Sequence, residues 1–205
     1  MSDALVLADD GLLRCPWGAG AEDYRRYHDD EWGRPVVDES RLLEKLCLEG
    51  FQSGLSWLTI LRKRPGFRDA FAGFDADTVA AFDDDDVERL LVDARIVRHR
   101  KKIEAAIANA RAVVQLHAAG QSLAALLWSY EPPAGPAPVA MGSLWSVTPE
   151  STSLAQALRG HGFRFLGPTT VYAAMQAMGL VDDHVDGCHA RARCEAERAA
   201  LVRPT

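Results

Sequence analysis

Apolar residues recur every three or four positions along most of the chain, which is the spacing of an amphipathic helix. The longest such stripe lies in the segment 99–118, and Gly120 follows its last apolar turn. Its apolar positions are Ile103, Ile107, Ala110, Val113 and Val114. Strict alternation of apolar and polar residues, the pattern of a half-buried strand, is scarce. The sequence therefore predicts an all-α fold.

Further helices are predicted where this pattern meets start and stop signals. An apolar run over 42–48 follows Asp38, Glu39 and Ser40, which are typical of a helix start. A second helix over 55–64 is expected to end at Pro65 and Gly66. Additional helices are predicted over residues 79–82, 86–94, 153–160 and 170–178.

Side chains that cap helices support several of these starts. Asp75 or Asp77 can cap the helix over 79–82, and the acidic run Asp83–Asp86 complements the dipole of the next one. Ser153 and Gln156 have the spacing of a capping box. A proline-rich loop over 131–138 offers a linker, but the chain length predicts a single domain over residues 1–205.

Composition places the chain among ordinary globular proteins. Hydrophobic residues make up 48% of it and charged residues 25%. It contains no apolar run of about 18 residues, so no membrane span and no membrane partner are expected. The acidic N-terminus lacks the basic region of a signal peptide, which predicts a cytoplasmic protein. In a reducing compartment, the cysteines are expected to bind metal or lie in the core rather than form disulfides.

The net charge of −6 counts against a nucleic-acid-binding protein, because such proteins usually present a basic surface. Charge is unevenly placed, however. The segment 95–102 is strongly basic, while 83–86 is wholly acidic. Net charge therefore does not identify the partner.

Two cysteines and two histidines lie at opposite ends of the chain. They are Cys15, His28, His184 and Cys188. A two-Cys, two-His set fills all four positions of tetrahedral zinc, so it indicates a structural ion rather than a catalytic one. Unpaired thiols with unrelated histidines remain the alternative, since neither half contains a CxxC pair.

The segment 160–179 predicts two helices joined by a tight hairpin that contains Gly162 and Gly167. Thr169 and Thr170 begin the second helix, whose free N–H groups can bind an anion. A hairpin that presents N–H groups to phosphate can hold DNA without reading its sequence. The alternative is an ordinary corner between two helices.

A carboxyl group and a dense set of aromatic side chains are the other candidates for chemistry. Glu49 ends an apolar helix, where an acid opposes the helix dipole. It is either a desolvated functional carboxylate or a solvated helix end. Aromatic residues cluster near Cys15 and His28, where they form either a stacking pocket or part of the core. These residues are Trp17, Tyr24, Tyr27 and Trp32, and Trp57 follows Glu49.

These motifs resemble those of the DNA-3-methyladenine glycosylase I family, the Tag-type enzymes of the helix-hairpin-helix superfamily. The resemblance covers about residues 15–188. The matching stretches are RCPWG at 14–18, YHDDEWGRP at 27–35, CLEGFQSGLSW at 47–57, DVERLLVDARIVRHRKKIEAAIANAR at 86–111 and GFRFLGPTTVYAAMQAMGLVDDHVDGC at 162–188. The segments outside a core of about 14–190, residues 1–13 and 190–205, are expected to be peripheral.

The resemblance implies a helix-hairpin-helix glycosylase fold in which structural zinc on the four Cys and His residues joins the chain ends. It implies that Glu49 recognises the damaged base and that the aromatic residues named above, with Trp57 foremost, line its pocket. DNA is expected to contact Gly162, Gly167, Thr169, Thr170, Gln52, Gly54 and Leu55. Asp183 is expected to support the metal ligand His184 or to cap a helix.

The implied activity is hydrolytic excision of 3-methyladenine from alkylated double-stranded DNA by a monomer, without strand cleavage. Residues 51–55 are expected to fill the space that the extruded base leaves. A DNA-binding module without catalysis would retain the hairpin and lack the pocket. A hydrolase that uses zinc would need an open coordination position, which four protein ligands do not leave.

Overall fold

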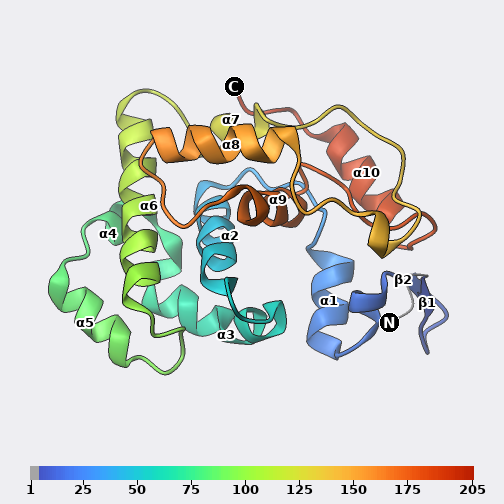
Figure 1. Cartoon of the computed structure of the whole chain (residues 1–205), viewed down its shortest axis with the longest axis horizontal. Helices are drawn as coiled ribbons and strands as arrows, with labels where there is room; N and C mark the ends of the chain where they lie inside the picture. Colours follow the sequence, from blue (N-terminus) through green and yellow to red (C-terminus); the bar gives the residue numbers. More distant parts are fainter. Residues whose placement is uncertain (1–4) are drawn as a thin grey trace.

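A computed structural model describes residues 5–205 (Figure 1). Helices dominate it, as predicted. The α-helices are α1 (Glu22–Asp30), α2 (Glu39–Gln52), α3 (Trp57–Ala70), α4 (Ala76–Ala80), α5 (Asp84–Val92), α6 (Arg100–Ala118), α7 (Leu123–Trp128), α8 (Pro149–Gly160), α9 (Pro168–Ala177) and α10 (Arg191–Ala200). Short 3₁₀ turns are η1 (Pro16–Ala19), η2 (Ala72–Phe74) and η3 (Met141–Ser143). Strands β1 (Val6–Leu7) and β2 (Leu13–Arg14) form an antiparallel pair.

Helix α2 runs through the centre of the molecule (Figure 1). It packs against α3, α6, α7 and α9, and every residue from Leu42 to Phe51 is buried. Burial on all sides removes Glu44, Lys45 and Glu49 from water along with their apolar neighbours. The central helix therefore carries charged groups into the core, where each needs a partner or a function.

Several predicted helix starts are confirmed by side-chain caps. Asp38 accepts a hydrogen bond from the N–H of Arg41, and Asp75 accepts one from Thr78. Asp83 and Asp86 form a capping box at the start of α5. Each bond satisfies a backbone donor that the first helical turn leaves free.

The largest errors in the predicted helix boundaries concern α3 and α8. Helix α3 continues through Pro65 and Gly66 to Ala70, because Pro65 faces solvent while Phe67 and Ala70 are drawn into the core. Gly66 also permits close packing, since a Cβ atom there would lie 2.6 Å from the Cβ of Arg95. Helix α8 begins at Pro149 rather than at 153, because Thr148 and Ser151 form its capping box.

The two ends of the described chain meet. The N–H of His189 donates to the carbonyl of Leu13, and Arg34 pairs with Glu197 of α10. Cys194 of α10 is buried. Within residues 5–205, no helix is long and apolar enough to cross a membrane.

Candidate functional site

The four predicted metal ligands converge in one buried cluster. Cys15 precedes η1, His28 lies on α1, and His184 and Cys188 lie in the loop between α9 and α10. Their candidate ligand atoms all lie within 4.8 Å of one another. Cys188 Sγ lies 3.5 Å from His28 Nε2 and 3.6 Å from His184 Nδ1, and Cys15 Sγ lies 3.8 Å from His184 Nδ1.

These distances fit a tetrahedral zinc ion. Zinc binds sulfur at about 2.3 Å and nitrogen at about 2.0–2.1 Å, so tetrahedral angles hold sulfur and nitrogen ligands about 3.6 Å apart. The measured distances between sulfur and nitrogen range from 3.5 to 3.8 Å. All four side chains are buried, which leaves no face of the cluster open to a substrate.

Hydrogen bonds also orient both histidines toward the centre of the cluster. His28 Nδ1 donates to Asp29 at 2.8 Å, which leaves Nε2 free to bind metal. His184 Nε2 donates to the carbonyl of Trp32 at 3.1 Å, which leaves Nδ1 free. Such outer contacts are what fixes the tautomer of a metal-binding histidine. Asp29 also accepts from His189 and from the buried Arg14.

Sequence reasoning missed Asp29, although its position next to a predicted ligand could have drawn attention to it. Asp183, in contrast, does not contact a ligand side chain. It accepts hydrogen bonds from Tyr172 and Gln176, both at 2.7 Å, and so anchors α9. The neighbouring Asp182 accepts from the backbone N–H of His184.

The predicted aromatic residues form a cluster beside this cysteine–histidine site. The ring of Trp17 lies 5.8 Å from that of Tyr24, 6.2 Å from Tyr27 and 5.0 Å from Trp32. Tyr27 in turn lies 5.4 Å from Trp57, the first residue of α3. All five predicted aromatic side chains therefore belong to one continuous group.

This group joins helices that are distant in sequence. Tyr24 on α1 accepts a hydrogen bond from the N–H of Leu58 on α3, at 3.0 Å. The indole N–H of Trp57 is buried and has no hydrogen-bond partner within residues 5–205. Trp32 lies deeper, 4.7 Å from the ring of His184, so it connects the aromatic group to the cysteine–histidine cluster.

Glu49 lies in the last turns of α2, close enough to Tyr27 for its charge to act on that side chain. It is 6% exposed, and its carboxyl group makes no hydrogen bond within the described part of the chain. Desolvation raises the pKa of Glu49 from 4.5 to about 8, although the charge of Lys45 acts to lower it. Burial is the main reason that the pKa of Tyr27 lies well above its usual value, and the charge of Glu49 raises it further. A desolvated, unpartnered carboxyl group beside aromatic rings is typical of a functional site.

Three other charged residues near Tyr27 form ion pairs with one another. Glu31 binds Lys45 at 2.8 Å and Arg64 at 2.6 Å. Burial acts to raise the pKa of Glu31, but these two cations lower it to about 2. Both cations lie about 6 Å from the ring centroid of Tyr27. Glu31 therefore differs from Glu49, which has no hydrogen-bond partner within residues 5–205.

The predicted hairpin joins α8 to α9. Gly162 has φ +93°, a conformation that side chains with a Cβ atom rarely adopt. Gly167 is the N-cap of α9 and provides no side-chain cap. The N–H groups of Thr169 and Thr170, in the first turn of α9, therefore remain available to an anion.

Of the other predicted DNA-contacting residues, Gln52 ends α2, and Gly54 and Leu55 lie between α2 and α3 in a segment that we call the wedge loop (residues 53–56). The predicted wedge also included Phe51, but Phe51 is buried in the core. Gly54 has φ +85°, and Leu55 is 42% exposed. The hairpin lies beside the last turn of α2, which leads into this loop, because a Cβ atom on Gly50 would lie 3.6 Å from the carbonyl oxygen of Phe165. The structure thus brings together two segments that are over 100 residues apart.

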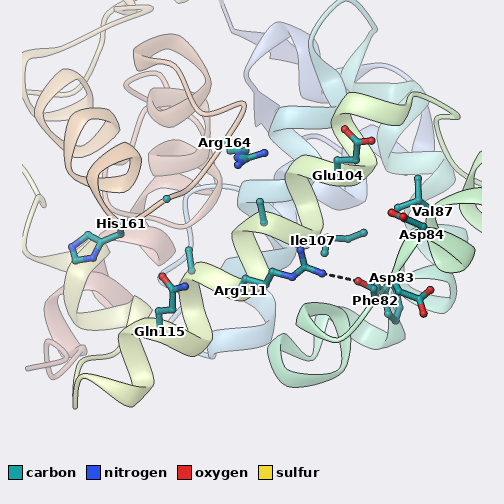
Figure 2. Close-up of a pocket in the computed structure, with 13 residues that line it drawn as sticks. Phe82, Asp83, Asp84, Val87, Glu104, Ile107, Arg111, Gln115, His161 and Arg164 are labelled. Atoms are coloured by element: carbon teal, nitrogen blue, oxygen red, sulfur yellow. Dashed lines mark hydrogen bonds between the residues drawn. The ribbon is translucent and has the colours of Figure 1, made fainter.

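A groove of about 460 Å³ runs along the far flank of the hairpin, between α5 and α6 (Figure 2). Arg164 and His161 lie at its hairpin side, and Asp83 and Asp84 at the other. Arg111 extends from α6 across the groove and donates to the carbonyl oxygens of Ala80 and Phe82. The groove includes Gly162 but neither Glu49 nor Trp57, so it is separate from the aromatic site.

Known proteins are similar to this chain in sequence and in fold. A family model for methyladenine glycosylases matches residues 17–192. The chain belongs to the methyladenine glycosylase family. It is 45% identical to DNA-3-methyladenine glycosylase 1 of Escherichia coli strain K12, over 86% of this chain and 96% of the relative.

Solved structures of methyladenine glycosylases also superimpose on it. One of 3-methyladenine DNA glycosylase I (TAG) aligns with a TM-score of 0.83 and 45% identity, covering 86% of this chain and 98% of that one. Another describes 3-methyladenine recognition by the Staphylococcus aureus enzyme, with a TM-score of 0.83 and 36% identity over 87% and 96% of the two chains. The family and the helical fold that the sequence indicated are therefore confirmed.

Proposed function

We propose that this methyladenine glycosylase excises 3-methyladenine from alkylated double-stranded DNA by hydrolysing the N-glycosidic bond. The buried side chain of Glu49 supports the proposal, because its carboxyl group has no hydrogen-bond partner within residues 5–205 and its charge acts on Tyr27 of the aromatic group. Relatives with matching folds are 3-methyladenine DNA glycosylases, and one structure describes how that base is recognised.

The aromatic group would hold the flipped base. Alkylation at N3 leaves the purine cationic, and an electron-rich ring attracts a cation by about 0.5–2 kcal/mol. Trp57 and Tyr24 are half-buried at the surface of the group, so their rings would stack on the base. Trp17 is half-buried as well, while Tyr27 and Trp32 are buried and hold these rings in place.

Glu49 would select adenine. Its carboxylate accepts hydrogen bonds from the adenine edge, including the exocyclic amine. Guanine offers an acceptor oxygen at that position, which would leave two acceptors facing each other in a dry site. A site that loses a hydrogen bond in this way discriminates strongly.

The chemistry needs little acid catalysis, because a cationic purine is already a good leaving group. As the glycosidic bond breaks, its electron pair leaves with the purine, which becomes neutral, and the sugar gains oxocarbenium character. Water then attacks C1′ and loses a proton to the solvent. The charge of Glu49, developed as the cationic base binds, would stabilise this state in a site of low polarity.

A covalent lyase step would need an available amine. The lysines of the chain are Lys45, Lys63, Lys101 and Lys102. Lys45 is paired with Glu31, while Lys63 and Lys102 donate to backbone carbonyls. Lys101 is exposed on α6. We therefore propose a monofunctional hydrolase that leaves an intact abasic site.

The hairpin would bind the DNA backbone through the N–H groups of Thr169 and Thr170, with Gly162 and Gly167 allowing close approach. The wedge loop would enter the duplex with Leu55, while Gln52 and Gly54 contact the opened base pair. Extrusion of a base costs a few kcal/mol, and a methylated base that pairs poorly lowers this cost.

We further propose that zinc, held by Cys15, His28, His184 and Cys188, joins the two chain ends within a single domain, with residues 14–190 as its core. The ion would supply stability and take no part in the reaction. The protein would act as a monomer. Loss of base release in Glu49→Gln and Trp57→Ala, with melting curves of folded proteins, supports the site. Full activity of both variants would refute it.

A further inference from the structure

Two buried polar side chains lie on one face of α6. Lys102 and Asn109 are seven residues apart, which is about two helical turns, so both point toward α2 and the hairpin. They are 8% and 2% exposed. Each reaches out of the helix and binds the backbone of a different segment that the proposed function places against DNA.

Lys102 binds the end of α2 and the start of the wedge loop. Its Nζ donates to the carbonyl of Phe51 at 2.9 Å and to that of Ser53 at 2.6 Å. Carbonyl groups at a helix C-terminus carry partial negative charge, so they suit an ammonium group. Burial lowers the pKa of Lys102, and no carboxylate within residues 5–205 forms an ion pair with it. Burying a cation costs free energy unless hydrogen bonds compensate it, so the bonds to these two carbonyl groups are important for this lysine.

Asn109 both accepts a hydrogen bond from the hairpin backbone and donates one to it. Its Oδ1 accepts from the N–H of Arg164 at 2.7 Å, and its Nδ2 donates to the carbonyl of the same residue at 3.4 Å. The next residue, Phe165, has φ +60°, which is unusual for a bulky side chain. The amide of Asn109 thus holds the hairpin in a conformation that it would not readily adopt alone.

The two bound segments meet at α6 with almost no free space. A cavity of only about 10 Å³ remains between Gly50, Lys102, Asn109 and Phe165. That is room for one water molecule at most. A shift of either segment would therefore move the other.

We infer that Lys102 and Asn109 are positioning residues that fix the distance between the wedge loop and the hairpin. This inference rests on the proposed function. The hairpin must bind the backbone while the wedge loop enters the base stack, and successive bases of one strand are only about 3.4 Å apart. If the wedge loop moved by about 1 Å relative to the hairpin, it would no longer meet the base stack correctly while the hairpin binds the backbone. The base pocket itself would remain intact.

Lys102→Met tests this, because it keeps the length of the side chain and removes its donors. Lys63→Met is a matched control, since Lys63 also donates to a carbonyl, that of Ala94 at 2.7 Å, but away from both loops. Each variant is assayed for kcat/KM on a methylated duplex, for affinity toward free 3-methyladenine by tryptophan fluorescence, and for thermal melting.

Loss of bonds to a charged donor predicts a fall of roughly 10- to 100-fold in kcat/KM on the duplex for Lys102→Met. Affinity for the free base should stay within about 3-fold, because no contact to the pocket is removed. A lesion placed in a mismatch, which opens more easily, should be excised with a smaller loss. Lys63→Met should behave like the wild type.

An equal loss of base affinity and duplex activity would overturn the inference, because Lys102 would then support the pocket as a whole. Unchanged excision from the matched duplex would overturn it as well. Asn109→Leu is expected to give the same split between duplex and free base, and it carries the test if Lys102→Met does not fold. A wild-type protein that releases no 3-methyladenine refutes the proposed function instead.

Discussion

Replacing Glu49 with glutamine removes one ionisable group and barely changes the shape of the side chain. Desolvation raises the pKa of this residue from 4.5 to about 8 in the folded protein. Because the folded pKa lies above the unfolded one, the protonated form is favoured by folding. Below pH 4.5 the group is neutral in both states and carries no penalty.

As pH rises through this range, the unfolded chain ionises and the folded protein resists ionisation. Stability is therefore lost between pH 4.5 and 8, and the loss is complete above the folded pKa. At about 1.36 kcal/mol per pKa unit, the wild type should lose about 3 kcal/mol by pH 7 and about 5 kcal/mol above pH 8. Glu49→Gln cannot titrate, so it should avoid this loss.

Urea unfolding of both proteins from pH 5 to pH 9 measures the effect. The free energy of unfolding of Glu49→Gln should exceed that of the wild type by an amount that grows with pH, while base release is lost throughout. This combination would mean that the carboxylate is retained for function at the expense of stability. A stability difference that stays flat over this pH range would refute the reasoning.

Other predictions concern the metal site and the stacking pocket. Cys188→Ala should destabilise the fold by several kcal/mol and abolish bound zinc, because metal binding contributes to folding; unchanged melting would rule out the metal tie. Asp29→Asn should weaken zinc affinity by about 10- to 100-fold in a competition titration with a chelator, whereas equal affinity would show that the contact to His28 does not matter. Trp57→Ala should raise the dissociation constant for free 3-methyladenine by roughly 5- to 30-fold, worked from about 1–2 kcal/mol of lost stacking on the indole ring; an unchanged constant would place the base elsewhere.

Local signals in the sequence predicted much of the fold. Helix α6 was expected over 99–118 and is found over Arg100–Ala118. The caps at Asp38 and Asp83 also follow from local rules. Local rules failed at Pro65, because burial of Phe67 and Ala70 outweighs the missing hydrogen bond of a proline that faces solvent.

The site shows a similar division. Spacing alone left zinc binding open, since Cys15 and Cys188 are far apart in the sequence, and only the fold brings them together. The isolation of Glu49 also needs the structure, because an identical residue type at Glu31 is fully paired. Lys102 and Asn109 gave no signal, since their roles depend on backbone groups of other segments.

The central claim is that this methyladenine glycosylase releases 3-methyladenine from DNA. Duplex DNA treated with a methylating agent carries several modified bases, and chromatography of the bases released by the purified wild-type protein tests the claim directly. We expect free 3-methyladenine, little methylated guanine and uncut strands that contain abasic sites. Release of methylated guanine at a similar rate, or of no base at all, would contradict the account.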